Sequence, residues 1–114
     1  PGMKYTHYAP NAPVYLIEQD LQQMQQAVQT LKQQQHKVAV LAPANFAAVN
    51  ADYYFSFGHE YELEQMSANL YDALRACDKT DATIILATTT ERKGVGTAIM
   101  NRLEKAAGGN WYQA

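Results

Sequence analysis

The apolar positions of this chain fall into two kinds of pattern. Short runs at residues 14–17, 37–42 and 82–88 are apolar along nearly their whole length, which is typical of strands covered on both faces of a sheet. A further strand is predicted at residues 53–57, because the sequence YYFSF is rich in residues that favour strands. Most other apolar residues recur at every third or fourth position, as they do on the buried face of a helix.

These stripes predict three helices that alternate with the strands. Asp20 followed by Gln23 resembles a capping box, so the first helix is expected to begin there. The pair Gly108-Gly109 is expected to end the last helix. The stripes are Leu21, Met24, Val28 and Leu31 in a glutamine-rich first helix; Leu63, Met66, Leu70, Leu74 and Cys77 in a second helix at 60–78; and Val95, Ile99, Leu103 and Ala106 in the third.

The order strand, helix, strand, strand, helix, strand, helix predicts an α/β fold with a mainly parallel sheet and helices on both faces, because a parallel neighbour needs a crossover connection. In the simplest arrangement the strand at 14–17 lies beside the strand at 82–88, and the chain winds outward to either side. A topological switch point then lies between these two strands, at whose carboxyl ends ligands usually bind. About ten residues join the strands at 37–42 and 53–57, which is short for a helical crossover.

The composition is typical of a single globular domain, with 114 residues of which 47% are hydrophobic and 18% charged. A net charge of -2 argues against a main role in coating nucleic acid or an acidic membrane. No apolar stretch is long enough to cross a bilayer, so we expect a cytoplasmic protein.

The one cysteine, Cys77, lies on an apolar stripe and is expected to be a core residue rather than a nucleophile. The three histidines are scattered, so no metal site is predicted.

The best internal candidate for a ligand site lies where the switch point is expected. Residues 18–20 follow one of the two strands, and TTTERKGVG at 88–96 follows the other. Two cations there precede a helix with glycines in its first turn, so free backbone N–H groups and positive charge converge on a place that suits an anion such as phosphate. The dinucleotide fingerprint is incomplete, because its third glycine position is Ile99, and a helix entry with solvated charges is the alternative interpretation. The candidate residues are Arg92, Lys93, Gly94 and Gly96.

Residues 1–13 hold three prolines and a glycine, which predicts an extended segment ahead of a domain at 14–114. Such a stiff tether with aromatic and basic side chains usually has a surface to contact. From the residues alone, packing of the aromatic rings against the chain's own domain is the simpler interpretation. The side chains concerned are Lys4, Tyr5, His7 and Tyr8.

Four stretches together resemble the two-domain threonylcarbamoyl-AMP synthases, over essentially the whole chain. PGMKYTHYAP resembles the interdomain linker of that family, and APVYLIE resembles the first strand of its C-terminal domain. LYDALRACDKTDATIILA is similar to a later helix and strand of the same domain, and KGVGTAIMNRLEKAAGG to its closing helix.

The resemblance implies a three-layer α/β/α Rossmann-like domain with a sheet of about four strands, preceded by an interdomain linker. It also implies an N-terminal catalytic domain on the same polypeptide, which binds ATP, Mg²⁺, L-threonine and bicarbonate. That domain forms threonylcarbamoyl-AMP and pyrophosphate for the N6-threonylcarbamoyladenosine of tRNA. This chain is then expected to be an accessory or regulatory part with no catalytic residue, cofactor or metal of its own, and inactive alone.

The same resemblance implies that the linker side chains cap the active site of the catalytic domain. This replaces the simpler interpretation, in which the aromatic rings pack against the chain's own domain. tRNA and tRNA-modification proteins stay open as further partners, whereas a membrane is not expected. Two alternatives to the accessory role are a stand-alone nucleotide- or anion-binding module and a protein-interaction module.

Overall fold

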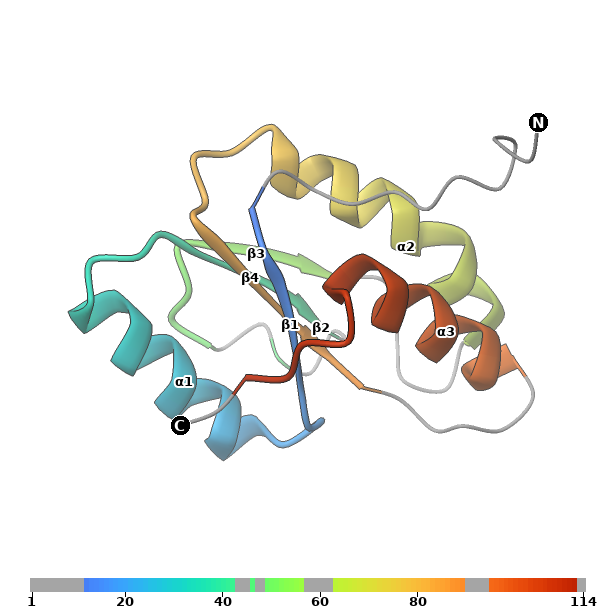
Figure 1. The fold of residues 1–114 in the computed structure, drawn as a ribbon, viewed down its shortest axis with the longest axis horizontal. Helices are drawn as coiled ribbons and strands as arrows, with labels where there is room; N and C mark the ends of the chain where they lie inside the picture. The colour runs from blue at the N-terminus through green and yellow to red at the C-terminus, as the bar shows by residue number, and fades with distance from the viewer. Residues whose placement is uncertain (1–11, 43–45, 47–48, 57–62, 90–94, 113–114) are drawn as a thin grey trace.

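The sheet at the centre of the molecule has four parallel strands in the order β1-β4-β2-β3 (Figure 1). This computed structural model describes residues 12–42, 46, 49–56, 63–89 and 95–112. The strands are β1 (Val14–Ile17), β2 (Val38–Ala42), β3 (Tyr53–Ser56) and β4 (Ile84–Thr88). The helices are α1 (Leu21–Gln33), α2 (Leu63–Asp78) and α3 (Val95–Ala107).

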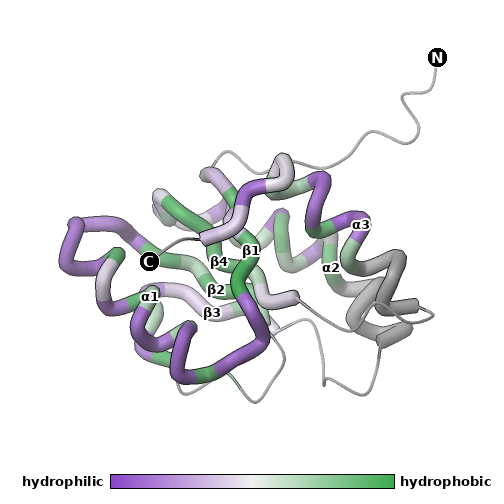
Figure 2. Tube along the Cα trace, turned by 60° about the horizontal axis from the view of Figure 1, so that its bottom comes forward, coloured by the Kyte–Doolittle hydropathy of each residue, from purple (hydrophilic) through white to green (hydrophobic). Residues whose placement is uncertain are grey.

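The helices form a layer on each face of the sheet, with α1 on one face and α2 and α3 on the other (Figure 1). Successive side chains of a strand point to opposite faces, so β2 directs Val40 toward α1 and Leu41 toward α2 and α3. Figure 2 shows the apolar strands enclosed between helices with hydrophilic outer positions. The predicted three-layer α/β/α Rossmann-like fold is therefore confirmed.

The predicted pairing of β1 with β4 is confirmed by the register, in which Val14 lies opposite Ile85 and Ile17 opposite Thr88. The predicted outward winding is wrong, because β4 lies between β1 and β2 and leaves β1 at the edge of the four-stranded sheet. Burial explains this order. All residues of β2 and β4 are buried and need a neighbour on each side, whereas β1 and β3 contain partly exposed residues.

Two described residues of the short connection from β2 to β3 lie on the α1 face of the sheet. Phe46 and Val49 of this connection are buried in the same core cluster as α1. These two side chains cover the sheet where a crossover helix would otherwise pack. The strands can therefore run parallel although the connection is short.

The chain after α3 adds a short parallel bridge to the outer edge of β1. Gly108 and Gly109 have φ angles of 61° and 77°, which lets the chain turn back at the end of the helix. The N–H of Leu16 then donates to the carbonyl of Asn110 at 3.0 Å, and the N–H of Tyr112 donates to the carbonyl of Leu16 at 2.8 Å. Residues 110–112, called the tail below, thus satisfy part of an edge that would otherwise be open.

Candidate functional site

The carboxyl ends of β1 and β4 lie side by side, and a switch point forms there although the chain does not wind outward from them, because their connections leave toward opposite faces. After β1 the chain continues into α1 on one face, and after β4 it continues into α3 on the other (Figure 1). The N–H of Thr89 donates to the carbonyl of Ile17 at 2.9 Å and extends this pairing beyond β4. The fold therefore places the candidate ligand edge where the sequence predicts it.

Among the residues that the structure describes, two buried polar atoms close to these strand ends have no hydrogen-bond partner. They are Oγ1 of Thr88, whose residue is fully buried, and Nε2 of Gln19, two residues beyond β1. An unsatisfied buried polar group costs roughly 1–3 kcal/mol, so such groups in a native fold call for a specific explanation such as a ligand or an ordered water. The sequence analysis included Gln19 and Thr88 in the segments at this edge, but no sequence pattern shows which of their polar atoms lack a partner.

The structure tests neither of the two predicted residue sets. Arg92, Lys93 and Gly94 lie outside the described residues, and Gly96 lies in the first turn of α3. The linker side chains, which are those of Lys4, Tyr5, His7 and Tyr8, also lie outside the described residues. Both assignments therefore stay predictions.

The thiol of Cys77 is a core group, as its place on the apolar stripe predicts. The residue is 2% exposed and lies in the cluster between the sheet and the helices α2 and α3. Burial raises the pKa of the Cys77 thiol to about 12, because the charged thiolate is poorly solvated there. Within the described ranges, no group of three His, Cys, Asp or Glu side chains could hold a metal ion.

A hydrogen-bonded pair of Tyr53 and Asp81 lies at the opposite edge of the sheet, where β3 begins and shortly before β4. The Tyr53 hydroxyl donates to the Asp81 carboxylate. This hydrogen bond raises the pKa of Tyr53 and lowers the pKa of Asp81, because it stabilises the neutral phenol beside the ionised carboxylate. The pair fixes the amino end of β3 and is not part of the switch-point edge.

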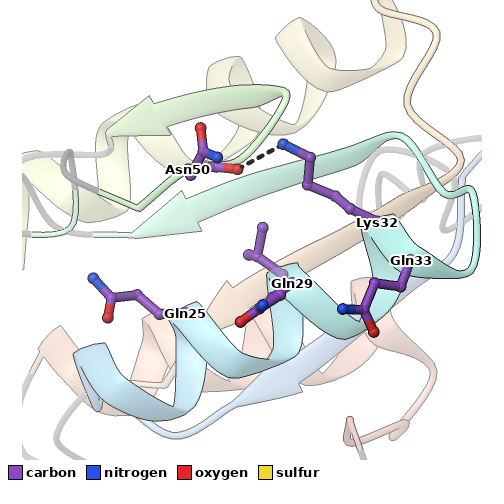
Figure 3. Close-up of a pocket in the computed structure, with 6 residues that line it drawn as sticks. Gln25, Gln29, Lys32, Gln33 and Asn50 are labelled. Atoms are coloured by element: carbon purple, nitrogen blue, oxygen red, sulfur yellow. Dashed lines mark hydrogen bonds between the residues drawn. The ribbon is translucent and has the colours of Figure 1, made fainter.

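Helix α1 is flanked by two hollows. The larger has a volume of about 480 Å³, and Figure 3 shows Lys32 there donating to the backbone carbonyl of Asn50 at 3.0 Å. The smaller has a volume of about 310 Å³ and separates α1 from the tail. The larger hollow is lined by Gln25, Val28, Gln29, Lys32, Gln33 and Asn50. The smaller is lined by Ile17, Glu18, Gln23, Gln26, Ala27, Thr30, Trp111 and Tyr112.

A parallel sheet covered on both faces, with a switch point at its carboxyl edge, defines a Rossmann-like α/β domain. Within that class, the chain belongs to the family described as "Threonylcarbamoyl-AMP synthase, C-terminal domain", whose model matches residues 1–108. No helix in the described part of the chain has the length and apolar character that a membrane crossing requires.

Curated relatives carry the name threonylcarbamoyl-AMP synthase. The chain is 47% identical over 110 residues to the Bacillus subtilis protein and covers 96% of itself and 32% of that relative. It is 39% identical over 112 residues to the Pyrococcus abyssi protein, again with 32% of the relative covered. The chain thus spans about a third of the length of these relatives.

Solved structures of the same family share the fold. Pyrococcus abyssi Sua5 complexed with L-threonine is 36% identical, with a TM-score of 0.83 over 100% of this chain and 33% of that chain. The C-terminal Sua5 domain of a Pyrococcus horikoshii protein is 34% identical, with a TM-score of 0.69 over 84% of this chain and 93% of that chain. In that second structure a domain of this kind was crystallised by itself.

Proposed function

We propose that this chain is the interdomain linker and accessory C-terminal domain of a cytoplasmic threonylcarbamoyl-AMP synthase. The full-length enzyme would join ATP, L-threonine and bicarbonate into threonylcarbamoyl-AMP with release of pyrophosphate, as a step of tRNA modification. ATP and Mg²⁺ would bind to the N-terminal catalytic domain of the same polypeptide. The observation that carries the proposal is the family match over residues 1–108 in a chain that spans about a third of its relatives.

The linker would cap the catalytic site through Lys4, Tyr5, His7 and Tyr8. Acyl-adenylates and carbamates react readily with water, so a lid of aromatic and hydrogen-bonding groups would protect the intermediate. Pro10 would stiffen the linker and reduce the entropy that it loses on docking.

Two observations support a function of the linker itself. The family match begins at residue 1 and therefore includes this segment. One solved relative, 35% identical with a TM-score of 0.82, is a variant of Pyrococcus abyssi Sua5 in which an adjacent histidine and tyrosine are both replaced by alanine. The present sequence has a single adjacent His–Tyr pair, His7 and Tyr8.

The capping role is tested by Tyr8→Ala in the two-domain protein. We expect product formation to fall about tenfold, or the intermediate to be hydrolysed instead of passed on, because water would enter the open site. Tyr8→Phe keeps the ring and should retain most of the activity. The measurement is synthesis of threonylcarbamoyl-AMP from ATP, L-threonine and bicarbonate, together with free AMP as the sign of leakage.

The same assay separates the domain assignment from the lid assignment. The 114-residue chain alone should give no product in it. Product formation by that chain would contradict the accessory role. Full activity of Tyr8→Ala with no additional AMP would contradict only the capping by the linker.

A second candidate function is binding of a nucleotide or another anion at the switch-point edge, through Arg92, Lys93, Gly94 and Gly96. Oγ1 of Thr88 at this edge, which has no partner among the described residues, favours it, since a bound phosphate would accept a hydrogen bond from the hydroxyl. Calorimetry of the 114-residue chain with ATP, AMP and pyrophosphate tests the site. If one of them binds, Thr88→Val should weaken binding without loss of stability, and Gly96→Val should abolish binding.

A further inference from the structure

The larger hollow beside α1 lies between that helix and the chain that leads into β3. One wall comes from α1, and Asn50 contributes the opposite side. Val28 is the one apolar residue among the described lining residues, and the others are polar. The volume of about 480 Å³ lies within the usual range of ligand sites.

Three glutamines follow one another at a spacing of four residues along the wall that α1 provides. They are Gln25, Gln29 and Gln33, called the glutamine row below (Figure 3). The helical rise places neighbours in this row about 6 Å apart along the axis. Each amide carries a donor and an acceptor side by side, so it can form two hydrogen bonds at once with a group that offers the same pair.

An extended peptide offers such pairs at nearly the same spacing. In a strand, the N–H and C=O of one residue point to the same edge, and the arrangement repeats at every second residue, about 6.6 Å further on. The amides of the glutamine row can therefore pair with alternate residues of an extended main chain, and their long side chains accommodate the small difference in spacing. A helical ligand does not fit in this way, because its N–H and C=O groups are already paired with each other.

Lys32 determines the charge that the hollow favours. Its ammonium group donates to the backbone carbonyl of Asn50 at 3.0 Å, which uses one of its three donors (Figure 3). Lys32 is the one charged side chain among the described lining residues, and α1 contains no other charged residue. A single cation without a carboxylate beside it matches the single charge of a glutamate or aspartate side chain better than the double charge of a phosphate monoester.

We propose that the larger hollow binds an extended, acidic peptide segment of a partner protein. The glutamine row would bind the main chain of that segment, and Lys32 would bind its carboxylate. A free peptide should bind with a dissociation constant on the order of 1 mM, because ordering exposed glutamine side chains offsets much of the hydrogen bonding. This site is separate from the switch-point edge and does not depend on the proposed role in threonylcarbamoyl-AMP synthesis.

Nuclear magnetic resonance of the 114-residue chain tests the site directly, because the side-chain NH₂ groups of glutamine give their own signals. The probe is the blocked peptide acetyl-Thr-Val-Glu-Val-Thr-amide, whose β-branched residues favour an extended chain. We expect its titration to shift the side-chain signals of Gln25 and Gln29 in a saturable way and to leave that of Gln23, which lines the smaller hollow, in place. The same peptide with N-methyl groups on its main chain should not bind, because it lacks the donors that the glutamine row requires.

Variants separate the two parts of the proposed site. Gln29→Ala should weaken binding about fivefold through the loss of hydrogen bonds. Gln26→Ala is the matched control, since it changes the same residue type on the same helix but lines the smaller hollow, and it should bind normally. Lys32→Gln should remove the preference for the peptide with Glu over its counterpart with Gln, and Lys32→Arg should retain that preference. Circular dichroism verifies that each variant is folded.

Three results would overturn the proposal. The first is the absence of a saturable shift of Gln25 and Gln29 with the acidic peptide. The second is equal binding by Gln29→Ala and Gln26→Ala, or undiminished binding of the N-methylated peptide. The third is binding of a short single-stranded RNA in place of the peptide, with the same dependence on Gln29 and Lys32, which would assign the hollow to RNA.

Discussion

At the scale of single residues, the thiol of Cys77 is expected to be inert in the folded domain. The thiolate is the reactive form, and burial raises the pKa of this thiol to about 12 from an ordinary value of 9.0. We predict that a thiol reagent at pH 8 labels the native chain very slowly and labels it completely in denaturant. Rapid labelling in native buffer would show that the core between the sheet and α2 and α3 opens readily.

The raised pKa of the Cys77 thiol also makes the stability of the fold depend on pH at high pH. Because the folded pKa is higher than the unfolded one, the buried neutral thiol contributes its full stabilisation below pH 9 and loses it as the pH rises toward about 12. Cys77→Ala removes the ionisable group. The difference in unfolding free energy between the two proteins should therefore be constant up to about pH 9 and shrink above it. A difference that stays constant up to pH 12 would contradict the burial of the thiol.

At the scale of secondary structure, Asp20 caps the amino end of α1. Its side chain accepts a hydrogen bond from the N–H of Gln23 at 3.1 Å, as the capping pattern predicts. We expect Asp20→Ala to lower the unfolding free energy by about 1 kcal/mol, because an N–H at the helix start loses its partner. Asp20→Asn keeps an acceptor and should cost less than half of that. Urea denaturation of both variants measures the effect, and equal losses would contradict the cap.

The helices were predictable because each has a clear apolar period, and the strands because each is a short apolar or aromatic run; the strands are bounded within two residues of their predicted limits. Neighbours in the sheet were only partly predictable. Pairing of β1 with β4 follows from the crossover rules, but the insertion of β4 beside β2 depends on which strands are buried on both edges. The bridge at Trp111 could not be predicted, because a single pair of backbone hydrogen bonds leaves no pattern in the sequence.

The switch-point edge and the smaller hollow also differ in how far the sequence could predict them. Local chemistry, such as glycines and cations before a helix, is visible in the sequence and indicated the switch-point edge. The smaller hollow is invisible there, since α1 and the tail come to border it together only after the whole sheet has formed. A site that joins distant segments requires the tertiary fold to be known first.

At the scale of the whole molecule, the two helical layers should unfold as one unit, because every inner strand supplies side chains to both. Leu41 is fully buried on the α2 and α3 face, while the tail, which contains Trp111, is bridged to β1 and packs Tyr112 against the α1 cluster. We predict that Leu41→Ala lowers the unfolding free energy by about 2–5 kcal/mol. The denaturation midpoint measured by Trp111 fluorescence should shift as far as the midpoint measured by circular dichroism. Leu21→Ala, at a residue that is 38% exposed, is the control and should change stability by less than about 0.5 kcal/mol. A fluorescence midpoint that stays in place while the circular dichroism midpoint moves would mean that the α1 layer and the tail unfold independently of the α2 and α3 layer, and that the sheet does not couple them.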